Sequence, residues 1–414
     1  MLRNFKTSKK NLLFFKKQRI LVAYVLFLVL ELLVFIKVSD LPSALGGWQQ
    51  KTAELANLQV PTDNFYGPGA ALLNLPFYLL SIDLTAAAIS YYVLGIIGFW
   101  KICELISSRR TRIIVLMSLP SNLYFIWLIN SSQDTVFEFF LLTWSCYFLI
   151  KKQYLWFSTF AFILSLTRAG YWTYFILSSI LILFLEYIRK KKINFRATVF
   201  APMLIIVSFF NLHFYNSVSP ALEGGMTAYF SYSKYHYLAL PKMDMDVFLS
   251  GPKGAFSEEF GPKIPKNSDL ADENRIYQKA AIQSALENKK ETVLGWMQKF
   301  DSYYFDVQKI PHLPGSYVLN QSEKIISIEN ERLTWSLVLG NLFYLFWRTL
   351  FVSFGLISIG IFLSTRFLFR KSTSISLNLW PLALPYLFGV IPGMLFYTET
   401  RFKIVSELIL VPLI

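Results

Sequence analysis

Charged residues are scarce in this chain of 414 residues, where Asp, Glu, Lys and Arg together make up 16%. An ordinary globular protein has about 25%. Apolar residues account for 54% of the chain, and the mean hydropathy is +0.44. This composition excludes a soluble enzyme, a coiled coil and a disordered chain. We therefore expect an all-α polytopic membrane protein.

Cysteine and histidine are also rare. The two cysteines, Cys103 and Cys146, lie in apolar stretches and are expected to be small buried side chains rather than a disulfide framework or a thiolate metal site. The three histidines, His213, His236 and His312, are far apart and lack metal-ligand spacing. The chain has neither a Walker-type phosphate loop nor a dinucleotide glycine fingerprint. Nucleotide-driven transport and zinc hydrolysis are therefore disfavoured.

Acidic residues are in deficit, with 26 acids against 40 bases and a net charge of +14. The bases cluster in short runs between apolar segments. If the N-terminus is cytoplasmic, alternation places every run on the same side, as the positive-inside rule requires. This pattern predicts solvated cytoplasmic loops in a cell (inner) membrane and argues against nucleic-acid binding. The runs lie at 3–19, 109–112, 151–152, 189–196 and 366–371.

Apolar segments near the length of a membrane span number about ten. The first follows the basic N-terminus and has no small-residue cleavage site after it, which predicts a retained signal anchor. We divide the chain into a cytoplasmic N-terminus (1–19), a seven-span module (20–215) that includes an outer loop (39–83), a large outer loop (216–334) and C-terminal spans (335–414). The predicted spans are 20–38, 84–106, 113–130, 135–150, 154–170, 171–188, 197–215, 335–364, 378–397 and 404–414.

The outer loops contain segments of their own. Apolar residues from Leu45 to Leu58 recur near helical spacing, which predicts a short helix on the membrane surface. The apolar stretch 70–80 is too short to span. The large loop carries 13 bases and 15 acids, so it is nearly neutral, and residues 271–300 are predicted to be helical.

Four acids lie at the predicted outer boundary of the membrane: Asp40, Asp63, Asp134 and Glu399. A carboxylate there can accept a proton from a hydroxyl group or hold a divalent cation. The alternative for each is a structural role. Asp134, for example, also suits the cap of the span that follows it, where the helix dipole would stabilise its charge.

Ionisable residues inside predicted spans are costly in lipid and suggest function. Glu31 and Glu138 are predicted to be interhelical partners. Arg168, at the outer end of its span, can meet an anionic phosphate, snorkel to the interface, or pair with an acid such as Asp134. Arg348 falls inside the long segment 335–364, the first part of which is predicted to lie along the interface.

Two cations, Arg401 and Lys403, depart from the charge pattern because they lie on the predicted outer side. They can bind lipid headgroups or act as a clamp for a phosphate leaving group.

The order of these features resembles the GT-C superfamily of membrane glycosyltransferases. The likeness is greatest to bacterial relatives of protein O-mannosyltransferases and of the aminoarabinose transferase that acts on lipid A. It covers about residues 15–215 and the last fifty residues. The features that carry it are Asp40 after the first span, the turn Tyr66-Gly67-Pro68-Gly69 before 70–76, Asp134 within 129–139, Leu166-Thr167-Arg168, and Thr400-Arg401-Phe402-Lys403 before Pro412.

The resemblance implies transfer of a sugar from a polyprenyl-phosphate donor, surrounded by membrane lipids, to a lipid, glycan or protein acceptor on the extracytoplasmic face. It implies no certain cofactor: two acids can bind a divalent cation (Mg²⁺ or Mn²⁺) or work without one, and both alternatives stay open.

The resemblance also implies roles for individual residues. The catalytic residues would be Asp40, Asp63 and Asp134. The residues that bind the donor phosphate would be Arg401, Lys403 and Arg168, and the residues that bind the substrate would be Tyr66 and Glu399.

Two other functions remain open. An O-antigen-type polymerase would display arginines for a pyrophosphate in its outer loop, but this loop has only Arg275 and Arg332. A flippase or transporter for lipid-linked sugar, which is not an enzyme, often has internal repeats and broken helices near mid-membrane. The sequence predicts neither.

Overall fold

A computed structural model of the chain describes most of the apolar segments and parts of the large loop. The described residues are 2–38, 45, 48–59, 68–131, 133–191, 198–215, 228–229, 263–265, 268, 270–290, 292–297, 317–320, 325–328, 346–353, 355, 357, 379–395 and 400–413.

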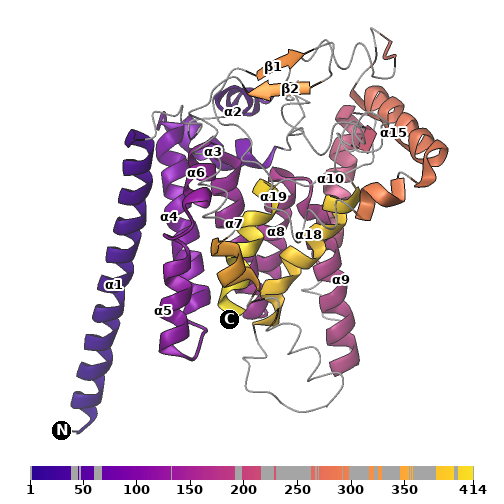
Figure 1. The fold of residues 1–414 in the computed structure, drawn as a ribbon. Coiled ribbons are helices and arrows are strands. Elements are labelled where there is room, and N and C mark those ends of the chain that lie inside the picture. The colour runs from indigo at the N-terminus through magenta and orange to yellow at the C-terminus, as the bar shows by residue number, and fades with distance from the viewer. Residues whose placement is uncertain are drawn as a thin grey trace.

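Helices dominate the described part of the chain (Figure 1). Their bounds are α1 (Leu2–Val38), α2 (Gln49–Ala56), α3 (Gly69–Leu79), α4 (Leu84–Cys103), α5 (Arg109–Ser118), α6 (Leu123–Ser131), α7 (Gln133–Ile150), α8 (Tyr154–Thr167), α9 (Tyr171–Lys190), α10 (Phe200–Tyr215), α15 (Leu270–Glu287), α18 (Leu384–Leu395) and α19 (Thr400–Leu410), with 3-10 turns η2 (Trp380–Ala383) and η3 (Val411–Leu413).

A small antiparallel pair of strands, β1 (Tyr317–Asn320) and β2 (Ile325–Ile328), adds to this helical fold, and Tyr317 lies opposite Ile328. The expectation of a helical protein is confirmed, and this short strand pair, which was not predicted, is an addition to it. Both segments are rich in β-branched and aromatic residues, which favour strands. They lie within the predicted large outer loop.

Within the described residues, three helices are long and apolar enough to cross a membrane: Gln18–Lys37, Leu84–Cys103 and Tyr171–Ile188. Three shorter apolar helices, Gly69–Leu79, Tyr154–Thr167 and Phe200–Phe214, accompany them. These helices are consistent with a multi-pass membrane protein, while the figure of about ten spans stays a prediction. The predicted surface helix corresponds to α2, and the predicted helix of the large loop to α15.

The segment 113–130, predicted as one span, is broken into α5 and α6. Pro120 lies in the break, and proline cannot continue a helical hydrogen-bond ladder. Asn122 then starts α6, since its side-chain oxygen accepts a hydrogen bond of 3.0 Å from the backbone N–H of Phe125. On the other side of the break, the Trp347 indole N–H donates to the carbonyl of Ser118 over 2.8 Å. The break is thus stabilised by side chains.

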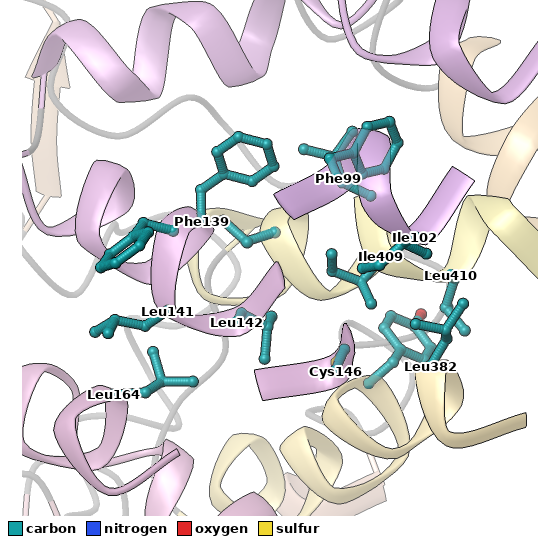
Figure 2. Close-up of a cluster of buried hydrophobic side chains, with 14 of the residues drawn as sticks. Phe99, Ile102, Phe139, Leu141, Leu142, Cys146, Leu164, Leu382, Ile409 and Leu410 are labelled. Atoms are coloured by element: carbon teal, nitrogen blue, oxygen red, sulfur yellow. The ribbon is translucent and has the colours of Figure 1, made fainter. Parts of the chain in front are cut away.

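Helix α7 lies at the centre of the bundle and packs against α4 and α8. Two glycines on α4 let α7 approach closely: a Cβ on Gly95 would come within 2.5 Å of the Phe139 ring, and one on Gly98 within 2.7 Å of the Thr143 hydroxyl. Small residues at such seams are typical of membrane helices. Figure 2 shows the apolar core around α7, which includes Phe99, Ile102, Phe139, Leu142, Cys146, Ile409 and Leu410.

The loop elements gather at one end of the bundle (Figure 1). The N-terminus lies at the far end of α1, whereas α2, α3, the strand pair and α15 lie at the opposite end, which we name the outer end. This arrangement agrees with the predicted alternation of short basic loops and larger outer loops. That the N-terminus is cytoplasmic stays a prediction.

Candidate functional site

The predicted site residues are only partly described by the structure. Asp40, Asp63, Tyr66 and Glu399 lie outside the described residues. Arg401 and Lys403 lie in α19, of which the structure describes the backbone at these positions. Asp134 and Arg168 are described in full, and both are buried close to the outer end of the bundle.

Polar side chains hold three helices together at the outer end. The Asn74 amide of α3 donates to the Gln133 side-chain oxygen of α7 over 3.2 Å. The Gln133 amide in turn donates to the backbone carbonyl of Leu84, the first residue of α4, over 3.4 Å. Because α4 begins directly after the first outer loop, these bonds place the start of α7 beside that loop.

Asp134 lies in the first turn of α7 and is 7% exposed. The helix begins one residue earlier, at Gln133, so Asp134 lies inside the helix rather than at its cap position. A carboxylate in the first turn is stabilised by the positive end of the helix dipole. The electrostatic part of the structural interpretation therefore holds, and the catalytic role stays a prediction.

One turn further along α7, Glu138 forms the centre of a buried polar cluster. Its Oε2 lies 2.9 Å from Nη1 of Arg168, and these side chains are 0% and 8% exposed. The Tyr171 hydroxyl donates to Oε1 of Glu138. A second Arg168 nitrogen, Nη2, donates to the Thr135 hydroxyl over 3.4 Å. Glu138 is thus an interhelical partner, as predicted, and Arg168 pairs with Glu138.

The sequence between α8 and α9 explains why two residues reach the same carboxylate. Helix α8 ends at Thr167, and Arg168 has an extended backbone with φ −139° and ψ 116°. Its carbonyl accepts a hydrogen bond of 3.0 Å from the N–H of Tyr171, the first residue of α9. This tight turn directs Arg168 and Tyr171 toward α7. An arginine at a helix C-terminus is also favoured by the helix dipole.

The same cluster ties α7 to α19. The Tyr171 hydroxyl lies 3.2 Å from the hydroxyl of Ser406, and α7 and α19 pack against each other. Glu138 is five residues from the start of α7 and Ser406 six residues from the start of α19. At 1.5 Å per residue, each N-terminus lies about 7–9 Å beyond this tie.

Both N-termini lie on the outer side of the tie. Helix α7 begins beside Leu84, at the first outer loop. Helix α19 ends in η3, which contacts α5, the helix that begins with the basic run at 109–112. The C-terminus of α19 therefore points away from the outer end and its N-terminus points toward it. Asp134 is therefore in the first turn of one helix, and Arg401 in the first turn of a neighbouring, similarly directed helix. Helix N-termini attract anions through their free N–H groups and their dipole. The α7 end already carries the Asp134 carboxylate, so the α19 end is the one that suits a phosphate.

A second buried ion pair follows directly on α19. Nε of Arg348 lies 2.7 Å from Oε1 of Glu407, and these side chains are 8% and 0% exposed. Nη2 of Arg348 also donates to the Tyr386 hydroxyl over 3.1 Å. Since Ser406 and Glu407 are adjacent, α19 is bonded both to α9, through Tyr171, and to the later segment that carries Arg348. Arg348 therefore has a structural partner.

The start of α3 packs tightly against the residue that precedes Arg168. A Cβ on Gly69 would come within 2.5 Å of both the backbone nitrogen and the hydroxyl of Thr167. We expect Gly69→Ala to lower the free energy of unfolding by about 1–3 kcal/mol, because a backbone atom cannot move aside as a side chain can. Thermal unfolding in detergent micelles measures the loss.

Gly170→Ala is the matched control, because its Cβ would meet only Pro392 Cγ at 3.9 Å and its φ of −57° suits alanine. That change should be neutral or stabilising, by up to about 1 kcal/mol. Equal losses in the two variants would show that the contact with Thr167 is not responsible.

Glu31 behaves differently from Glu138. It lies half-buried on α1, and among the described residues its buried Oε2 has no hydrogen-bond partner. The expectation that Glu31 is an interhelical partner is thus not supported by a hydrogen bond to this oxygen. Helix α1 buries Leu28 and Leu32 on one side and leaves Leu30 and Val34 exposed on the other, as expected of a helix at the edge of the bundle.

In the part of the chain that the structure describes, no group of three His, Cys, Asp or Glu side chains could hold a metal ion. Three of the four acids at the predicted outer boundary, Asp40, Asp63 and Glu399, lie outside that part. Whether a divalent cation takes part therefore stays open.

The chain matches no protein-family model, no curated protein and no solved structure. The function is therefore inferred from the residues themselves.

Several residues of the cluster were not expected to contribute: Tyr171, Ser406, Glu407 and Tyr386. A signal existed for Glu407, since it is an acid inside an apolar segment and the same reasoning that selected Glu138 applies to it. The other three are hydroxyl residues, which are common in membrane helices. Their role depends on which helices contact each other, and hydropathy and residue spacing do not predict those contacts.

Proposed function

We propose that this protein is an integral-membrane glycosyltransferase. It moves a sugar from a polyprenyl-phosphate donor to a lipid, glycan or protein acceptor at the extracytoplasmic face of the cell membrane. The observation that supports this most is the pair of neighbouring helix N-termini at the outer end, one carrying Asp134 and the other Arg401. A carboxylate and a phosphate-binding end side by side are what such a transfer requires.

The chemistry needs few groups. An acceptor hydroxyl attacks the anomeric carbon of the sugar, the bond from that carbon to the phosphate oxygen breaks, and polyprenyl phosphate leaves. The hydroxyl proton passes to a carboxylate, for which Asp40, Asp63 and Asp134 are the candidates. Negative charge grows on the departing phosphate, where the start of α19 and Arg401 would stabilise it. Lys403 would add a second positive charge, and Tyr66 and Glu399 would orient the substrate.

In this proposal Arg168 acts as a positioning residue. Its guanidinium is balanced by Glu138 at 2.9 Å, so it contributes little free charge to a phosphate. Its pairing fixes the turn before α9 and, through Tyr171, the distance between α7 and α19.

The test is product formation by the purified protein in detergent, with radiolabelled polyprenyl-phosphate sugars and extracted membrane acceptors. We expect label to reach an acceptor with the wild type. Transfer should fall about 100-fold in the variant that lacks the general base, chosen among Asp40→Asn, Asp63→Asn and Asp134→Asn. Arg401→Ala should also lose transfer because the leaving phosphate is then less stabilised.

Glu104→Gln is the control, since Glu104 follows the end of α4 away from the outer loops and forms a surface pair with Lys101 at 3.1 Å. This variant should keep full activity. Transfer that survives all three aspartate substitutions would contradict carboxylate catalysis. No transfer from any donor would contradict the enzyme proposal.

A flippase for lipid-linked sugar is the second candidate, because the break between α5 and α6 is a feature that transporters often have. With ten residues, α5 rises about 15 Å, which is half the thickness of the hydrocarbon core. A flippase forms no covalent product in detergent, so the same assay separates the two. Lipid movement across sealed vesicles without product would favour the flippase.

A further inference from the structure

Helix α15, in the large outer loop, is apolar on two opposite sides. One side packs against the protein: Tyr277 is 5% exposed and Ala281 2% exposed. The Tyr277 ring lies 5.6 Å from the ring of Tyr229. This side of α15 thus faces the rest of the protein.

The other side leaves large apolar residues uncovered. Ile282 is 61% exposed and Leu286 is 62% exposed, one turn apart. After α15 ends, the helical residues 292–297 add Val293 at 51%, Leu294 at 48% and Met297 at 63%. These five residues lie within sixteen positions of a nearly neutral loop, in two groups that we together name the α15 apolar face. Exposed apolar patches of this kind mark contact surfaces.

Basic residues flank the α15 apolar face. Arg275, Lys279, Ile282 and Leu286 follow one another at spacings of four, three and four, so they share one stripe of the helix. Lys289 and Lys290 are exposed between the two apolar groups. Between residues 275 and 297 the sequence has four bases against two acids. Apolar residues bordered by Lys and Arg are typical of helices that lie in the plane of a membrane surface.

The place of α15 in the fold fits such a surface. Figure 1 shows α15 at the height of the outer ends of the bundle helices and oblique to them, whereas the strand pair lies further out. The bundle helix α10 leaves its aromatic residues uncovered up to its end, with Phe209 at 66%, Phe210 at 44% and Phe214 at 46%. Phe214 precedes the end of α10 by one residue, so exposed apolar side chains reach the bundle's outer end. A bilayer that covers α10 would reach the level of α15.

We propose that the α15 apolar face lies in the outer surface of the lipid bilayer, with Ile282, Leu286, Val293, Leu294 and Met297 among the acyl chains and Lys279, Lys289 and Lys290 at anionic phospholipid headgroups. The occupant of this face is membrane lipid. The large loop would then be held against the membrane at a second place, apart from the spans. This inference does not depend on glycosyl transfer.

The test uses nitroxide labels on the full-length protein in nanodiscs of phosphatidylcholine and phosphatidylglycerol. The native Cys103 and Cys146 are both 0% exposed, so introduced cysteines can be labelled selectively. The variants are Leu286→Cys and Met297→Cys. The control is Gln283→Cys, an exposed polar position on the same helix, about 60° from Leu286. Collision rates are measured with oxygen, which enters lipid, and with a water-soluble nickel chelate.

We expect the ratio of oxygen to nickel collisions to be several-fold higher at Leu286 and Met297 than at Gln283. Equal ratios at all three positions would place the face in water and overturn the proposal. Labels shielded from both reagents would mean that another protein or a second copy covers the face, which would also overturn it.

A second measurement tests the charges. Lys289→Gln combined with Lys290→Gln should lower the ratio at Met297 in nanodiscs that contain phosphatidylglycerol, and should have less effect in phosphatidylcholine alone. Equal effects in the two lipids would contradict the role of anionic headgroups. Because neither measurement uses a sugar donor, failure here leaves the proposed transfer untouched, and failure of the transfer assay leaves this inference untouched.

Discussion

Glu138→Gln should lower the free energy of unfolding by about 3–5 kcal/mol, because the buried Arg168 loses the carboxylate that balances its charge. The two groups are 2.9 Å apart and almost fully buried, so little solvent is present to compensate. Glutamine keeps the shape of the side chain and an oxygen that can still accept the Tyr171 hydroxyl. The loss therefore reports on charge and not on packing. Denaturant titration of the purified protein in detergent measures it.

The matched control is the double variant Glu138→Gln with Arg168→Met, which removes both charges. Replacing a buried ion pair by neutral residues is often nearly neutral, so most of the stability should return. Glu104→Gln, which breaks the exposed pair with Lys101, should cost no more than about 1 kcal/mol. If the double variant is as unstable as the sum of its single variants, the pair does not couple, and this account of the cluster is wrong.

Arg348→Met should have an effect of similar size, about 3–5 kcal/mol, because it leaves the Glu407 carboxylate buried without its guanidinium. Glu407 is 0% exposed and its Oε1 lies 2.7 Å from Nε of Arg348. Tyr386 also loses a hydrogen-bond donor at 3.1 Å. Because α19 loses one of its polar anchors, we also expect faster protease cleavage before this helix. Unfolding curves and time courses of limited proteolysis check the two effects.

Adding Glu407→Gln to Arg348→Met should restore both stability and protease resistance, since no buried charge then remains. Phe351→Leu provides a packing control, because Phe351 is buried beside Trp347 in the same helical segment but carries no charge. Its loss should not be changed by Glu407→Gln. Full stability in Arg348→Met alone would mean that this pair does not hold α19.

Much of the helical order was predictable from hydropathy, since lipid requires long apolar runs and the basic loops between them alternate. The apolar part of α1 (Gln18–Lys37), α4 and α9 follow the predicted spans closely, whereas the start of α1 at Leu2 was not predicted. The break between α5 and α6 was missed because a run of apolar residues hides it. Pro120 and Asn122 were visible in the sequence, but the contact from Trp347, which lies more than two hundred residues later and also stabilises the break, was not.

For the candidate site, the sequence identified which residues are unusual but not which residues meet. Arg168 had three open interpretations, and the structure shows a pair with Glu138, one helical turn beyond Asp134. Distinguishing the two acids needs the distance between α7 and α8 at the residue level, and periodicity does not give it. Glu407 was missed altogether, although it is the partner of an arginine that the sequence did identify.

The pairing of Arg348 with Glu407 also has a consequence for how the protein is made. The two residues are separated by 59 positions, whereas Glu138 and Arg168 lie on helices that are consecutive in synthesis. The first pair can close while the nascent chain is still short. Arg348, in contrast, has no carboxylate to balance its charge until the helix that carries Glu407 has been synthesised. We therefore expect the late helices to take up their final arrangement only once α19 is complete, because a buried arginine without its partner is costly.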